Sequence, residues 1–236
     1  MNLPIIEYPT FELIIPSTKE TIRYRPFLVR EEKILLMAQQ SSNINDLMYA
    51  VKQIIINCVI TAGFDIDKLM VFDVEYIFLK LRANSVNNQI NLTYKDGEDD
   101  KNYTVSLDLN TVEVEFRPDH SNKIKINETT YLFLKYPGLT VSDKMMNVTS
   151  PEQAFMEMVK SCLDKLMSGE ELFYFKDEKE EDIDKFIDSL PIPTFDAIKT
   201  FFETMPKLRH ILKYTNSLGH EQEIVLETLN DFFTLR

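Results

Sequence analysis

The sequence predicts an α+β fold with N-terminal helices, a central antiparallel β-meander, and C-terminal helices that end in a β-hairpin and a short helix. Apolar residues recur at helical spacing up to residue 83, alternate with polar residues between 84 and 141, and return to helical spacing after that. A period near 3.6 residues indicates a helix with one buried side, and a period of two indicates a strand. We therefore predict three parts, 1–83, 84–141 and 142–236.

The N-terminal part is predicted to begin with an extended segment and to continue as helices. Alternation over residues 11–15 followed by a Pro-Ser-Thr turn indicates an edge strand or a short hairpin. Helical spacing then covers residues 30–40 and 46–62, and Gly63 is suited to cap the second of these helices. Residues 71–85 continue the helical spacing, although their β-branched and aromatic residues leave a strand open.

The central part is predicted to form an antiparallel meander, because short β-rich segments alternate with turn residues such as Asp96-Gly97 and Pro118-Asp119. One face of such a sheet packs on helices, and the other meets water or a partner. The five predicted strands are NQINLTY, YTVSLDL, TVEVEF, NKIKIN and TYLFLKY.

The C-terminal part returns to helices. Ser150 is placed to cap a helix whose apolar stripe reaches Leu166 and which Gly169 would close. A strongly acidic helix is predicted over residues 177–188, and Thr194 is placed to cap a helix that ends at Phe202. Two strands around residues 217–219 and a short apolar helix complete the prediction.

The composition favours an acidic protein that binds other proteins. The formal net charge is −12 and the basic residues form no stripe, so we expect no nucleic-acid partner. No apolar run approaches the ~20 residues of a membrane span, and the first residues lack a secretory signal. Cys58 and Cys162 are predicted to be buried reduced thiols, which fits synthesis in a reducing cytoplasm.

The motifs of catalysis and cofactor binding are not found in the sequence. Its three histidines form no HExxH pattern, and its five glycines form neither a dinucleotide fingerprint nor a phosphate loop. Acidic pairs such as Glu31-Glu32 and Asp99-Asp100 do not identify a general acid and base in a chain with 38 acidic residues. We therefore expect no enzymatic activity, no cofactor and no metal site.

Three features leave alternatives open. The segment KDGEDDKN, residues 95–102, is expected to be a hairpin tip, with a calcium loop as the alternative. Met145, Met146 and the methionines of residues 155–167 are expected to pack in the core, with a plastic contact surface as the alternative. The acidic run 177–188 is expected to be a solvated helix face, with docking of a basic partner as the alternative.

Two segments, Ile22 to Gln40 and Phe72 to Ser85, match the pattern of a known family. Their order and their separation in the chain match it as well. The chain resembles the baseplate hub subunit and hub assembly protein family of T-even-type myophages, and its ending TNSLGHEQEIVLETLNDFF resembles the family more loosely. The matching residues that we single out are Arg25, Pro26, Phe27, Arg30, Glu31, Glu32, Lys33, Phe72, Asp73, Glu75, Tyr76 and Arg82.

The resemblance implies a structural component of the bacteriophage tail that acts through protein-protein contacts in hub and baseplate assembly. It implies other tail baseplate and hub proteins as partners, leaves homo-oligomers open, and places the chain in the virion tail baseplate. One alternative is a transient hub assembly chaperone that is absent from the mature virion. A third is a tail-associated cell-wall enzyme.

The same residues also have a physical interpretation of their own. Pro26 fixes the chain before the first helix, and Arg25 and Arg30 lie near acidic residues in the sequence. We predict an internal clamp in which Arg25 and Arg82 bridge the N-terminal arm to the third helix through carboxylates. Whether these residues specify the fold or form a contact surface stays open at this point.

Overall fold

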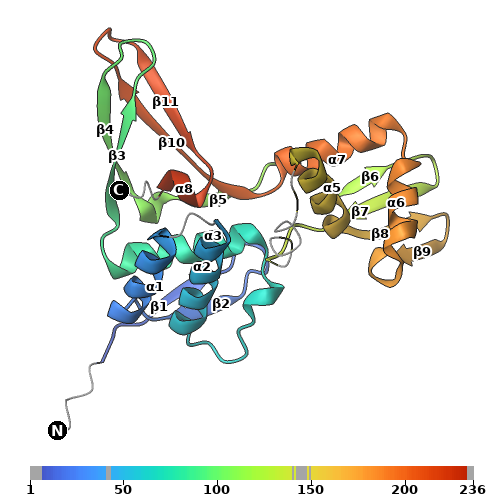
Figure 1. Ribbon diagram of the computed structural model, residues 1–236, viewed down its shortest axis with the longest axis horizontal. Helices are drawn as coiled ribbons and strands as arrows, with labels where there is room; N and C mark the ends of the chain where they lie inside the picture. Colours follow the sequence, from blue (N-terminus) through green and yellow to red (C-terminus); the bar gives the residue numbers. More distant parts are fainter. Residues whose placement is uncertain (1–6, 41–43, 140, 142–147, 149, 233–236) are drawn as a thin grey trace. The chain divides into compact units, whose positions relative to one another are not determined.

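The computed structural model describes residues 7–40, 44–139, 141, 148 and 150–232 (Figure 1). Helices and small antiparallel sheets confirm the α+β class. The chain forms two compact units: unit 1 comprises residues 1–115 and 207–236, and unit 2 comprises residues 116–206. These bounds differ from the three predicted parts, because β10 (Lys207–Thr215) pairs with β5 (Glu113–Glu115) and so joins the C-terminal strands to unit 1.

Unit 1 begins with an antiparallel hairpin and three helices. The hairpin pairs β1 (Phe11–Ile14) with β2 (Thr21–Tyr24), as one of the two predicted forms. The helices are α1 (Val29–Gln40), α2 (Ile44–Cys58) and α3 (Val71–Ser85), and a 3₁₀ turn covers Ile66–Lys68. Residues 71–85 are therefore helical and not a strand.

The end of α2 differs from the prediction. The helix stops at Cys58, four residues before the predicted end, and Gly63 adopts a φ of 75° in a turn beyond it. Ile60 donates its backbone N–H to the carbonyl of Arg23 at 2.8 Å, and Arg25 donates to the carbonyl of Cys58 at 3.0 Å. The chain leaves the helix because its backbone pairs with β2 instead.

The core of unit 1 lies between α2, α3 and the first hairpin. Ile54, Ile55, Ile77, Leu79 and Leu81 are fully buried. Truncating one such side chain to alanine typically costs about 2–5 kcal/mol. Helix α3 is buried on almost all sides, so most of its apolar residues are needed for packing.

Two long hairpins complete unit 1. One pairs β3 (Gln89–Lys95) with β4 (Asn102–Asp108), and the other pairs β10 with β11 (Glu221–Leu226), followed by the short helix α8 (Leu229–Phe232). Figure 1 shows the hairpins side by side. The single predicted meander is wrong: its strands are divided among separate sheets, because β5 pairs with a strand that lies far along the chain.

Acidic side chains join the tips of these two hairpins. Tyr214 donates its hydroxyl hydrogen to Asp96 at 2.7 Å, and Asn216 donates its amide to Glu98 at 2.7 Å. Ser217 donates both its backbone N–H and its hydroxyl hydrogen to Asp99, at 3.0 and 2.7 Å. The segment 95–102 is thus the predicted hairpin tip, and three of its carboxylates act as hydrogen-bond acceptors between strands.

Unit 2 packs three helices on one face of a four-stranded sheet. The sheet has the order β6 (Lys123–Lys125), β7 (Thr130–Leu134), β8 (Leu163–Ser168) and β9 (Glu171–Tyr174). The helices are α5 (Pro151–Cys162), α6 (Glu180–Asp188) and α7 (Ile192–Thr204), with a 3₁₀ turn at Phe175–Asp177. The shared core contains Ile124, Leu132, Leu134, Val159, Leu163, Ile198 and Phe201.

Two predicted boundaries in unit 2 are wrong, and one cap is confirmed. Ser150 caps α5 by accepting the N–H of Gln153 at 3.1 Å, as predicted. The helix ends at Cys162, and Gly169, with a φ of 60°, lies in the β8–β9 turn and does not close it. Helix α7 begins at Ile192, so Thr194 lies inside the helix and is buried there.

Both cysteines are buried free thiols, as predicted. Burial raises the pKa of Cys58 to about 11 and that of Cys162 to about 12, so both stay protonated near neutral pH. Met156 packs against the core of unit 2, and Met145 and Met146 lie outside the described residues. Within the described part of the chain, no helix is long and apolar enough to cross a membrane.

Candidate protein-binding surface

Arg25 and Glu31 fix the start of α1 against the end of α2. Glu31 is fully buried and accepts the N–H of Leu28 at 2.9 Å, so it caps its own helix from inside the first turn. Arg25 donates to the Glu31 carboxylate at 3.0 Å and to the carbonyl of Asn57 at 2.8 Å. A cation therefore meets the carbonyls at the end of α2, where the helix dipole favours positive charge.

The charge of Glu31 is held by its hydrogen bonds. Burial alone would raise the pKa of this carboxyl, but hydrogen bonds from Arg25, Leu28 and Arg30 outweigh it and lower the pKa to about 2. Arg30 contributes through its Nε at 2.6 Å while most of its side chain is exposed. Arg25 and Glu31 form a buried ion pair, and the loss of one partner would leave the charge of the other buried and unpaired.

The predicted bridge from the arginines to α3 is wrong. Arg25 donates to Glu31 near the start of α1 and to the carbonyl of Asn57 near the end of α2, and Nη1 of Arg82 has no hydrogen-bond partner among the described residues. The bridge to α3 is made by other groups. Phe27 donates its N–H to the hydroxyl of Ser85 at 2.7 Å, and its ring contacts that of Phe78 with 5.8 Å between centroids.

Asp73 and Tyr76 connect α3 to the rest of unit 1. Asp73 accepts the N–H and the hydroxyl hydrogen of Ser17 at 2.9 and 2.6 Å. Tyr76 donates its hydroxyl hydrogen to Glu113 at 2.9 Å, beside the buried Lys80, which donates to the carbonyl of Val112 at 2.8 Å. Sequence reasoning missed Lys80, although its position between Leu79 and Leu81 was a signal for a buried cation.

The remaining predicted residues differ in exposure. Phe72 is buried, Glu32 is half-buried and Lys33 is exposed on α1. Burial, and next the carboxylate of Asp231, raise the pKa of Glu75 to about 7. Arg25, Glu31 and Phe27 thus contact groups that join helices of unit 1, Asp73 and Tyr76 contact the first hairpin and β5, and Arg30 and Lys33 are the exposed members.

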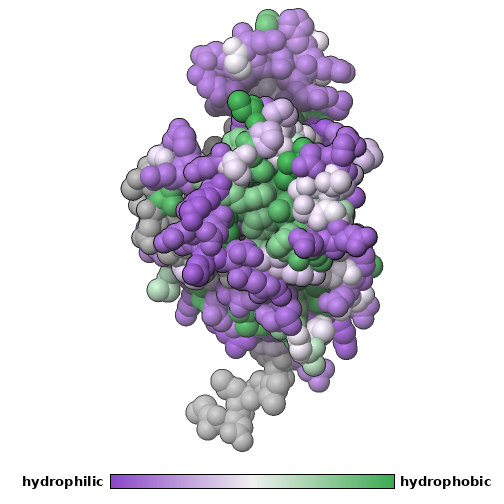
Figure 2. All heavy atoms as spheres, turned by 90° about the vertical axis from the view of Figure 1, so that its right-hand side faces the viewer, coloured by the Kyte–Doolittle hydropathy of each residue, from purple (hydrophilic) through white to green (hydrophobic). Residues whose placement is uncertain are grey.

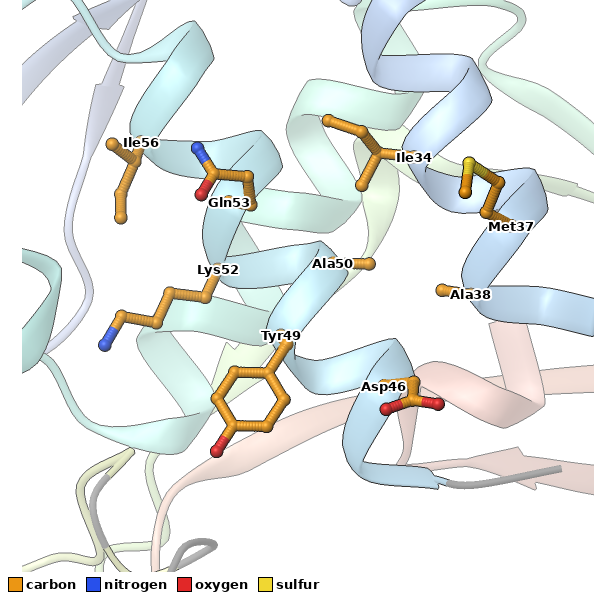
Figure 3. A pocket seen from close by; sticks show the side chains of 9 residues that line it. All are labelled: Ile34, Met37, Ala38, Asp46, Tyr49, Ala50, Lys52, Gln53 and Ile56. Carbon is orange, nitrogen blue, oxygen red and sulfur yellow. The ribbon is translucent and has the colours of Figure 1, made fainter. Parts of the chain in front are cut away.

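The frame made by these contacts carries a groove between α1 and α2. Figure 3 shows Ile34, Met37 and Ala38 on α1 facing residues of α2. Ala38 and Ala50 have short side chains and so leave space between the helices, which amounts to a volume of about 560 Å³. The α2 side is lined by Asp46, Tyr49, Ala50, Lys52, Gln53 and Ile56.

Apolar side chains at the groove are open to solvent. Met37 is 73% exposed and Ile56 is 46% exposed. An apolar surface of this kind favours protein binding, because covering it removes apolar area from water. No group of three or more histidine, cysteine or acidic side chains suited to a metal ion occurs in the described part of the chain. The groove offers shape and apolar contact to a partner, and its lining suits the helix of another protein.

Comparison with known families places both units in one group of proteins. The model of the family described as T4 bacteriophage base plate protein matches residues 8–234, which covers nearly the whole chain. The chain belongs to this T4 baseplate protein family. The predicted relation to T4-type phage baseplates is confirmed, and it locates this protein in the bacteriophage baseplate among other baseplate proteins. Searches among curated proteins and among solved structures gave no significant match.

Proposed function

We propose that this baseplate protein is a component of the baseplate hub that acts by binding other hub and tail proteins during baseplate assembly. It is made in the host cytoplasm and incorporated into the virion, and it performs no catalysis. The observation that carries the proposal is the exposed apolar groove between α1 and α2, two helices that Arg25 joins through its contacts to Glu31 and to the carbonyl of Asn57.

The groove has the form of a site prepared before binding. The Arg25 contacts to Glu31 and to the end of α2 fix the start of one wall relative to the other. A preformed site loses little conformational entropy when a partner binds, so more of the contact energy appears as affinity. Met37 and Ile56 are the proposed anchors, because they are the large hydrophobic side chains of the lining, apart from the aromatic Tyr49, that are strongly exposed.

The direct test changes the groove and leaves the frame intact. In a reconstitution with the other baseplate proteins of the same phage, Met37→Lys and Ile56→Lys should each weaken co-purification at least about tenfold. Ile192→Lys is the matched control, because Ile192 is 78% exposed on α7, outside the groove. Equal binding by the groove variants and the control would refute the groove as the binding surface.

One observation favours a second candidate function, that of a transient hub assembly chaperone. The net charge of −12 favours solubility of the free chain, as a factor that leaves the complex requires. The two candidates differ in whether the chain remains in the finished particle. Mass spectrometry of purified particles beside the infected-cell lysate separates them: a fixed copy number in particles supports the hub component, and presence in lysate complexes alone supports the chaperone.

A further inference from the structure

The two faces of the unit 2 sheet carry different side chains. On one face, Ile124, Leu132, Leu166 and Phe173 form a row across the four strands; the first three pack in the core, and Phe173 lines a pocket with residues of α6. The residues between them point to the opposite face, because successive side chains of a strand alternate. That opposite face is called the open face here, and it consists of Lys123, Lys125, Tyr131, Phe133, Lys165, Met167, Leu172 and Tyr174.

The open face combines lysines with aromatic rings. The strand register places Lys123, Phe133, Lys165 and Tyr174 in one row across the sheet. The ammonium group of Lys123 lies 4.1 Å from the ring centroid of Tyr131, and that of Lys165 lies 5.2 Å from that of Phe133. Such cation–π contacts hold the lysines against the sheet and leave their hydrogens free to donate elsewhere.

The charges of the open face are not balanced by the residues that the structure describes. Lys125 pairs with Glu128 at 2.9 Å, but neither Lys123 nor Lys165 has a carboxylate at ion-pair distance there. This is notable in a chain with 38 acidic and 26 basic residues. Leu172 and Tyr174, on the edge strand of the same face, are 46% and 40% exposed.

The opposite charge lies on the helical side of the same unit. Residues 177–188 include seven acidic and two basic residues, and Ile187 anchors α6 to the core beneath the sheet. Glu181 and Asp188, seven positions apart on α6, are exposed on one stripe of the helix. Because α6 packs on the covered side of the sheet, its carboxylates cannot reach the open face of their own chain.

We propose that the open face of the unit 2 sheet binds the acidic α6 surface of a second copy of this chain. The lysines then gain the carboxylates that they lack, and the partner helix covers the exposed apolar edge at Leu172 and Tyr174. The two surfaces differ, so the contact is head-to-tail and joins copies into a closed ring or an open row. On the face of the molecule drawn in Figure 2, hydrophobic side chains lie between hydrophilic ones.

The first test is the mass of the purified full-length chain in solution, by sedimentation or light scattering over a range of concentrations. We expect species larger than a monomer that dissociate when NaCl rises from about 0.1 M to about 1 M, because the screening length falls from about 10 Å to about 3 Å. A monomer at every concentration in low salt would overturn the proposal.

Charge reversal identifies the surfaces. The double variant K123E/K165E should raise the dissociation constant of self-association about tenfold or more. The double variant K95E/K199E is the matched control, because it makes the same change in net charge at two exposed lysines outside the open face, and Lys199 also lies over a ring, that of Phe195. Circular dichroism verifies that each variant is folded. Equal effects of the two double variants would contradict the proposed face.

A mixing experiment tests the head-to-tail arrangement. The variant E181Q/D188Q loses the acidic surface and keeps the open face, whereas K123Q/K165Q loses the open face and keeps the acidic surface; neutral substitutions are used because two charge-reversed surfaces would attract each other. Each alone should be monomeric, and their equimolar mixture should form a dimer that does not grow, because only one intact contact can form. A mixture that stays monomeric would overturn the arrangement.

The groove variants Met37→Lys and Ile56→Lys should leave self-association unchanged, so this inference and the proposed hub function can fail separately.

Discussion

The carboxylate of Asp73 accepts two hydrogen bonds from Ser17, which lies 56 positions earlier in the chain. The backbone nitrogen of Ser17 lies 2.9 Å from Oδ1 of Asp73, and the hydroxyl oxygen of Ser17 lies 2.6 Å from Oδ2. The same carboxylate accepts the N–H of Met70 at 3.1 Å. One side chain thus caps α3 and attaches it to the turn between β1 and β2. The N-terminal hairpin is held to the helical core through this contact, so it belongs to the frame that supports the groove.

Ser17→Ala should lower the free energy of unfolding by about 1–3 kcal/mol, because it leaves part of a buried carboxylate without its donor. Urea unfolding measures this loss. Thr18→Ala is the control: Thr18 accepts only an exposed contact from Glu20 at 3.2 Å, so its loss should stay below about 0.5 kcal/mol. Equal losses for the two variants would show that the hydrogen bond from Ser17 to Asp73 does not contribute more to stability than an exposed contact.

Arg25→Met should lower the free energy of unfolding by about 3–5 kcal/mol, because it leaves the buried charge of Glu31 without its main partner. The double variant Arg25→Met, Glu31→Gln should be less destabilised than the sum of the two single variants, since neither charge is then left alone. A double-mutant cycle measured by urea unfolding checks the difference. Additive losses would contradict a direct coupling between the two side chains.

The same pair predicts a dependence of stability on acid. The folded pKa of Glu31 is about 2, below its ordinary value of 4.5, so its contribution is fully present above pH 4.5 and is lost as the pH falls toward 2. Thermal unfolding between pH 6 and pH 3 should show a steeper loss of Tm for the natural chain than for the double variant. Parallel curves would contradict this assignment.

Glu75 predicts a dependence of the opposite sign. Its folded pKa of about 7 lies above the ordinary value of 4.5, so the folded state binds this proton more tightly and stability falls as the pH rises through this window. Glu75→Gln should raise the Tm at pH 8 relative to the natural chain and change it little at pH 4. Glu12→Gln, on the exposed side of β1, should have the same small effect at both pH values.

The elements that depend on local patterns were predictable from the sequence. The hairpin around residues 217–219 and the cap at Ser150 depend on neighbouring residues, and both are present. The strand β8 was not predicted, because Leu163 and Leu166 fit the helical stripe of α5 as well as the alternation of a strand. Its pairing with β7, which is distant in the sequence, decides between the two.

The candidate surface was predictable only in part. The family residues include the Arg25–Glu31 pair, yet the carbonyl of Asn57 that completes the contact lies 32 positions away and has no sequence signature. The groove itself depends on two alanines on different helices, which look like ordinary core positions in the sequence. Long-range packing, and not local propensity, decides such features.

The most direct test of the hub assignment measures this protein in purified phage particles. Particles are prepared from infections in which the phage gene encodes the natural chain, the groove variant Met37→Lys or the control Ile192→Lys, and the copy number per particle is measured by quantitative mass spectrometry. We predict a fixed copy number for the natural chain and the control, and a strong reduction for the groove variant. Absence of the natural chain from particles would contradict its role as a hub component.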